Sequence, residues 1–254
     1  MSRARVAFEL ARPALLFGAY VVLAMNGIWL LAVPVAVACF LASFVLQHDT
    51  IHSSLGLSRA ANELTLTLSG LLLLKSGHGQ RATHLRHHGK LLAEDDPEGS
   101  IVHWPFWRVV LAGPFYVLGG RAAAMRLSPP TRRHQIAETA ATVLVAAGMV
   151  LLYVRTGSLV GLVYWAVVFV LSATTALWGA YIPHSVSPDD PLVRRAAALS
   201  AWWTPVLNTF AFHDLHHRFP RVPTALLPDF ARAVGPEVAF APHEHPEPVR
   251  PVVG

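Results

Sequence analysis

The sequence predicts an all-helical integral membrane protein, with four transmembrane helices in two hairpins and a cytoplasmic helical cap. Apolar residues make up 54% of the 254 residues and charged residues only 14%, against roughly 25% charged in soluble globular domains. The apolar residues are also concentrated in long runs, as in membrane proteins. The single cysteine, Cys39, lies inside such a run and excludes an intrachain disulfide.

Four apolar runs are expected to cross the hydrocarbon core of a bilayer, which is roughly 30 Å thick. Only a few residues separate the two runs of each pair, so each pair is expected to form a helical hairpin. The predicted helices are about residues 10–26, 28–47, 138–154 and 158–182. Two further apolar stretches, 64–74 and 101–120, are too short or too interrupted to span and are expected to lie at the membrane interface.

The chain is expected to form one domain over residues 1–254, with the cap at 48–137 and 183–230 and a loose tail at 231–254. Of the 20 Lys and Arg residues, only Arg155 falls in a loop on the outer side. This bias predicts a bacterial-type inner-membrane protein with both termini and the cap in the cytoplasm. The basic residues form no block, so an anionic lipid surface is favoured over nucleic acid as the partner.

Three histidine clusters are notable for their spacing. The segment HDTIH carries two histidines at positions i and i+4, and HLRHH and HDLHH each carry three at i, i+3 and i+4. On a helix these offsets place the imidazoles on one face. The residues are His48, His52, His84, His87, His88, His213, His216 and His217.

These clusters indicate a metal site at the cytoplasmic side of the membrane. Neutral imidazole binds zinc, copper, iron or nickel, and eight donors exceed the four of a structural zinc site, so two metal ions are expected to share the set. A zinc-dependent membrane hydrolase would use the same imidazoles with a catalytic carboxylate. A metal transporter or sensor is the other alternative, although transporters bind near the bilayer midplane and the four apolar runs contain no histidine.

The three clusters, in this order and with two apolar runs before the first and two between the second and third, resemble the histidine boxes of the membrane fatty acid desaturase superfamily. That superfamily also contains alkane hydroxylases and carotenoid ring ketolases and hydroxylases. The resemblance implies a di-iron oxidoreductase that uses O2 and takes the eight box histidines as ligands. His184, in AYIPHS, matches the place of a further family ligand.

The resemblance also bears on substrate and partners. AYIPH and the acidic EDDPE are similar to segments of carotenoid ring oxygenases, which slightly favours a carotenoid over a fatty acyl chain. Small residues between 172 and 180 are expected either to open a pocket for a ring or to pack helices closely. Because the sequence has no haem or iron–sulfur motif, electrons are expected from a separate ferredoxin or cytochrome.

Several polar residues near the boxes have two interpretations. Asp49 and Asp214 each follow the first histidine of a box, and either orients an imidazole from the second coordination sphere or is a solvated or capping carboxylate. The residues Glu94, Asp95 and Asp96 are expected to form an exposed turn before Pro97. His78, in SGHGQ, either lines the site or, as the favoured interpretation, is a polar loop residue.

Overall fold

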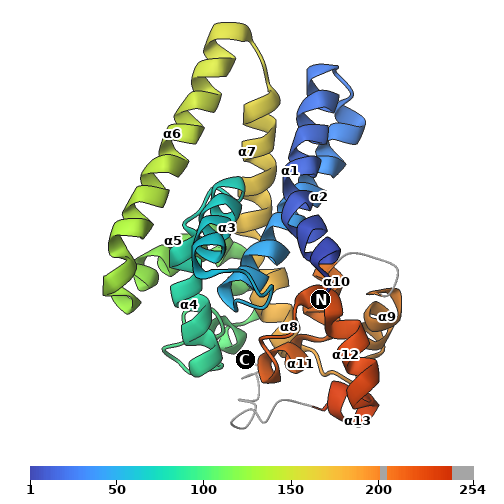
Figure 1. Ribbon diagram of the computed structural model, residues 1–254. Helices are drawn as coiled ribbons and strands as arrows, with labels where there is room; N and C mark the ends of the chain where they lie inside the picture. The colour runs from blue at the N-terminus through green and yellow to red at the C-terminus, as the bar shows by residue number, and fades with distance from the viewer. Residues whose placement is uncertain (201–204, 242–254) are drawn as a thin grey trace.

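The computed structural model of the protein describes residues 1–200 and 205–241, and every regular element within them is a helix. Two long antiparallel hairpins form the body (Figure 1). The first consists of α1 (Arg3–Met25) and α2 (Trp29–Ile51), and the second of α6 (Arg132–Thr156) and α7 (Val160–Ala173). The turns of both hairpins lie at the same end of the molecule, as predicted.

The body has the exposure pattern of a membrane protein. The helices α1, α2 and α6 are long and apolar enough to cross a membrane, and α7 with its continuation is a fourth, bent candidate. In α6 the polar residues Gln135 and Glu138 are buried, whereas Val143 and Leu144 are 61% and 71% exposed. This inversion of the soluble pattern suits a helix that faces lipid. The chain is an integral membrane protein.

The fourth predicted helix is broken rather than continuous. Helix α7 ends at Ala173, and the chain continues at an angle of 41° as a π-helix, η3 (Ala176–Tyr181), and α8 (Ile182–Ser185). Pro183 has no N–H to donate and its ring crowds the carbonyl four residues earlier, which favours a local departure from regular α-helix. The wider π-turn accommodates the proline and brings His184 toward the other histidines.

The cap packs around one end of the body (Figure 1). It contains α3 (Arg59–Leu72), α4 (Gly77–Gly89), η1 (Ser100–His103), α5 (Phe106–Leu127) and η2 (Pro129–Thr131), followed after α8 by α9 (Pro191–Ser200), α10 (Pro205–Ala211), α11 (His213–Arg218), η4 (Thr224–Leu226), α12 (Leu227–Val234) and α13 (Pro236–Ala239). The predicted loose tail therefore begins later than residue 231, because α12 packs Leu227 and Ala231 into a core with Leu215. Residues 242–254 of that predicted tail lie outside the described part.

Helix α5 crosses the body where α7 breaks. A Cβ on Gly113 of α5 would lie 2.0 Å from the carbonyl oxygen of Ala173, so only glycine permits this approach. The first turn of α5 exposes Phe106 and Trp107, and the interfacial position of this stretch stays a prediction.

A buried histidine joins the cap to the second hairpin, and the prediction for it was wrong. His78 is not a polar loop residue: it lies in the first turn of α4 and is 4% exposed. Its Nδ1 lies 2.7 Å from Glu138 Oε1 on α6 and its Nε2 lies 2.9 Å from Glu63 Oε2 on α3. The two carboxylates satisfy both ring nitrogens, which is why burial is tolerated.

Candidate metal centre

The nine predicted histidine ligands converge from four helices at the cap end of the body. His48 lies in the last turn of α2 and His52 is its C-cap residue, whereas the second box occupies the last turns of α4 and the third box forms α11. His184 lies in α8, after the π-helix. The i, i+3 and i+4 offsets place each box on one helix face, as predicted from their spacing.

The first histidine group consists of His48, His52, His84 and His216, whose ligating nitrogens all lie within 4.8 Å of one another. His52 Nε2 and His84 Nε2 are buried and have no hydrogen-bond partner among the described residues. Buried polar atoms are normally satisfied. Two such nitrogens in one cluster of imidazoles indicate a place for a metal ion.

The second histidine group consists of His87, His184, His213 and His217. His184 Nε2 lies 3.1 Å from His87 Nε2 and 3.0 Å from His213 Nε2, and His217 Nε2 lies 3.1 Å from His213 Nε2. Imidazole nitrogens that bind one metal at about 2.0–2.1 Å are separated by about 3.0–3.4 Å. The spacing of these nitrogens therefore fits coordination of a common ion.

His88, the remaining predicted ligand, lies between the two groups. Its Nε2 is 3.2 Å from Nε2 of His216 in the first group, and its ring stacks on His217 of the second group with centroids 4.3 Å apart. The groups are therefore contiguous, and nine of the 14 histidines of the chain lie in one cluster.

Burial disfavours the protonated form of five of these imidazoles. It lowers the pKa of His52 from 6.5 to about 2 and that of His213 to about 3, and the neighbouring imidazoles lower both further. The pKa values of His84, His216 and His217 are lowered well below 6.5 for the same reasons. A neutral imidazole has a free lone pair, so at neutral pH these five residues can bind metal without losing a proton.

Two carboxylates from one loop hold one histidine of each group. Asp96 Oδ2 lies 2.7 Å from His87 Nδ1 in the second group, and Glu98 Oε2 lies 2.8 Å from His84 Nδ1 in the first. A carboxylate that accepts the Nδ1–H fixes the ring with Nε2 free for a metal. The prediction of an exposed turn is thus correct for Glu94 and Asp95 but wrong for Asp96, which is 1% exposed.

No spacing in the sequence predicts this arrangement, because the loop must fold back over α4 to bring the carboxylates to the histidines. Asp96 is fixed there by the backbone N–H groups of Leu92 and Glu98, at 3.0 and 2.9 Å. A Cβ on Gly99 would lie 2.3 Å from Asp96 Oδ2. The glycine is the one local signal that the chain passes close to this carboxylate.

Asp49 supports the first group indirectly. Its Oδ1 accepts hydrogen bonds from the backbone N–H and the hydroxyl of Thr224, at 2.9 and 2.6 Å, and is 3.8 Å from His48 Nδ1. The Thr224 hydroxyl lies 3.4 Å from that same nitrogen. Asp49 thus joins α2 to η4 and positions a hydroxyl beside His48, whereas Asp214 lies half-buried in the first turn of α11.

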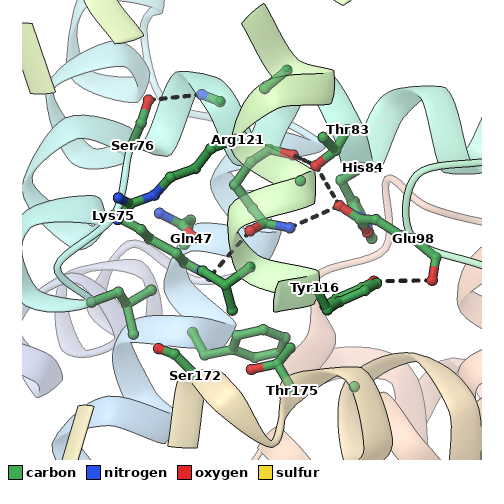
Figure 2. Close-up of a pocket in the computed structure, with 18 of the residues that line it drawn as sticks. Gln47, Lys75, Ser76, Thr83, His84, Glu98, Tyr116, Arg121, Ser172 and Thr175 are labelled. Carbon is green, nitrogen blue, oxygen red and sulfur yellow. Dashed lines mark hydrogen bonds and ion pairs between the residues drawn. The ribbon is translucent and has the colours of Figure 1, made fainter. Parts of the chain in front are cut away.

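A cavity of about 520 Å³ adjoins the histidine cluster. Its lining comes from α2, α4, α5, α6, α7 and η3 and includes His48, His84, His87, His213 and His216. Much of the remaining lining is apolar, including Phe44, Val143, Val168, Phe169 and Trp178. Figure 2 shows His84, Glu98 and Tyr116 on one side of it, with the hydrogen bond from the Tyr116 hydroxyl to the Glu98 carbonyl.

The small residues of the fourth helix divide between a cavity wall and helix packing. Ser172, Ala173, Thr175, Gly179 and Ala180 line the cavity. Ala176 instead packs in a buried cluster with Ile101 and Val109. The break in the helix therefore combines an open cavity wall with close helix packing.

Fold and site together define a helical membrane protein with a histidine-rich di-metal site beside a largely apolar cavity. The profile of the family described as Fatty acid desaturase matches residues 26–248, and the chain belongs to this family of di-iron oxidoreductases. No significant match was found to a curated protein or to a solved structure.

Proposed function

We propose that this protein oxidises a membrane lipid with O2, using two iron ions held by the two histidine groups. His48, His52, His84 and His216 would hold one ion, and His87, His184, His213 and His217 the other, with His88 as the further ligand between them. The observation that carries the proposal is the pair of four-histidine groups beside a largely apolar cavity in a chain of this family.

The residues present fit such a metal pair. All the donors are imidazoles, which suit iron among other transition metals, and two of them have buried nitrogens that lack a partner among the described residues. When bound, the iron pair supplies the redox chemistry by which O2 removes hydrogen from an unactivated C–H bond. Asp96 and Glu98 would support two of these ligands without binding metal themselves, because they hold His87 and His84 in the tautomer with Nε2 free.

The protein contributes position and exclusion of water. Helices α5, α6 and α7 wall the cavity with apolar side chains, so a lipid chain is held beside the histidines in a dry environment. The helix break at Ala173 gives this wall its shape, because η3 turns away from the axis of α7. Which carbon is oxidised then depends on how far the lipid enters the cavity.

The proposal includes a separate electron donor of the ferredoxin or cytochrome type, since the sequence carries no motif for a redox cofactor of its own. It also keeps the predicted orientation, with the histidine centre on the cytoplasmic side where such a donor would be present. The slight preference for a carotenoid rests on the AYIPH and EDDPE segments and is kept as the substrate hypothesis that the lipid assay tests against fatty acyl chains.

The test is expression in hosts that make different lipids, with mass spectrometry of the lipid extracts. We expect a new oxidised or desaturated lipid with the wild-type protein and none with His216→Ala. His103→Ala is the matched control, because His103 is exposed and its Nε2 contacts only the carbonyl of Leu92. A product that persists in His216→Ala would contradict the proposal. Zinc instead of iron in the purified protein would also contradict it and would favour the hydrolase alternative.

A further inference from the structure

Two cationic side chains lie in the wall of the otherwise apolar cavity. Lys75 follows α3, and Arg121 lies on α5. Arg121 donates to the carbonyl of Leu74, the residue before Lys75, at 3.2 Å, so the two side chains belong to one region of the wall. Figure 2 shows both on the same side of the cavity, together with Gln47.

Neither cation is neutralised by a carboxylate. Among the described residues, Lys75 and Arg121 form no ion pair. Lys75 Nζ donates to Gln80 Oε1 at 3.2 Å and lies 5.4 Å from the ring centroid of Phe44. Burial lowers the pKa of Lys75 to about 8, with Glu98 acting to raise it and Arg121 to lower it.

The nearest acid is already engaged. Glu98 is the only carboxylate in the described lining of the cavity, and it accepts hydrogen bonds from Gln80 Nε2 at 2.8 Å and from the Thr83 hydroxyl at 2.6 Å, besides its contact with His84. Both oxygens of the Glu98 carboxylate are therefore already used, one by Gln80 and Thr83 and the other by His84. The positive charge of Lys75 and Arg121 is left facing the cavity.

A third polar group in this region also lacks a partner. Gln47 is 1% exposed and lines the cavity on α2, one turn from Phe44. Its Nε2 is buried and has no hydrogen-bond partner in the described part of the chain. An unsatisfied buried amide costs free energy unless a ligand completes it.

From these observations we propose that Gln47, Lys75 and Arg121 form a subsite for the anionic group of a lipid. A carboxylate or a phosphate ester offers acceptor oxygens to all three donors, and guanidinium and ammonium groups form charge-assisted hydrogen bonds with such anions. This inference rests on the proposed function, since it identifies the group by which the lipid substrate is held. A carotenoid hydrocarbon would leave the Gln47 amide without an acceptor and the two cations without a counter-charge, so this subsite favours an acyl lipid over the carotenoid hypothesis.

The test is binding to the purified, iron-loaded protein in phosphatidylcholine nanodiscs, with empty nanodiscs subtracted. Tritiated palmitate, hexadecyl phosphate and hexadecanol share one chain and differ in the head group. We expect at least one anion to bind tenfold to a hundredfold more tightly than hexadecanol, and the tighter of the two identifies the group. Lys75→Met should lose that preference and keep hexadecanol affinity within about twofold.

The controls separate a specific subsite from general charge and from misfolding. The chain has one other lysine, Lys90, which is exposed, and Lys90→Met should keep the preference, as should the charge-conserving Lys75→Arg. Equal affinity of the wild-type protein for all three lipids would overturn the subsite. So would a loss of the anion preference in Lys90→Met as large as the loss in Lys75→Met. Iron is counted in the same samples: a preference without iron would refute only the proposed function, and iron without a preference would refute only the subsite.

Discussion

Replacement of Asp96 by asparagine tests how the histidine centre is held. The Asp96 carboxylate accepts three hydrogen bonds, from His87 Nδ1 and from the backbone N–H groups of Leu92 and Glu98. Asparagine keeps the shape, but its NH2 group must face at least one of those donors. Loss of a hydrogen bond to a charged group costs about 1.5–3 kcal/mol, which corresponds to roughly a tenfold to 150-fold weaker hold on the metal near His87.

The measurement is iron content against graded chelator concentrations, by mass spectrometry of purified protein. We expect Asp96→Asn to release one iron at a chelator concentration at least tenfold lower than the wild-type protein does, while the other iron is retained. Asp95→Asn is the matched control, because Asp95 is exposed and pairs with Arg86 at the surface. Identical release curves for Asp96→Asn and wild type would refute the role of this carboxylate.

Three further predictions address the cavity, the charge state and the topology. Gly179→Leu should fill the cavity wall and lower lipid turnover at least tenfold with iron still bound; normal turnover would exclude this wall from the substrate path. Because the pKa of His52 is lowered to about 2, the unfolded chain takes up protons below about pH 6.5 that the folded metal-free chain does not. The apparent Tm of metal-free protein should therefore fall from pH 6.5 to pH 5, and a Tm unchanged on acidification would contradict the buried neutral state of His52. A cysteine at Thr156 should react with an impermeant reagent in intact cells and one at Ser187 should not, against the low background of the buried Cys39, and labelling at Ser187 would reverse the orientation.

The elements that follow from local pattern were predictable. The apolar runs gave both hairpins, and the histidine offsets gave the residues of the site, because side chains three and four apart on a helix share a face. His184 was found only through the family resemblance, since a single histidine after a proline has no spacing of its own. Its approach to the second histidine group depends on the π-helix, which the sequence signals only by Pro183.

The residues that depend on chain reversal were not predictable in the same way. Asp96 belongs to a charged stretch before a proline, which is typical of an exposed turn, and only the return of this loop over α4 buries it. His78 was likewise assigned to a loop because its partners, Glu63 and Glu138, lie 15 and 60 residues away. A buried polar residue whose partners are distant in sequence leaves little local signal. Lys75 is different, because a lysine that directly follows four leucines is a local sign of a cation in apolar surroundings.

The most direct test of the account is the number and identity of metal ions per chain. Protein purified without chelator and reconstituted anaerobically with Fe²⁺ should contain about two iron ions per chain, and His52→Ala and His213→Ala should each lose iron, because these residues belong to different histidine groups. Both variants should still insert in the membrane, since the apolar helices form without metal. A wild-type protein that holds no iron, or iron content unchanged in both variants, would contradict a di-iron centre built from these histidines.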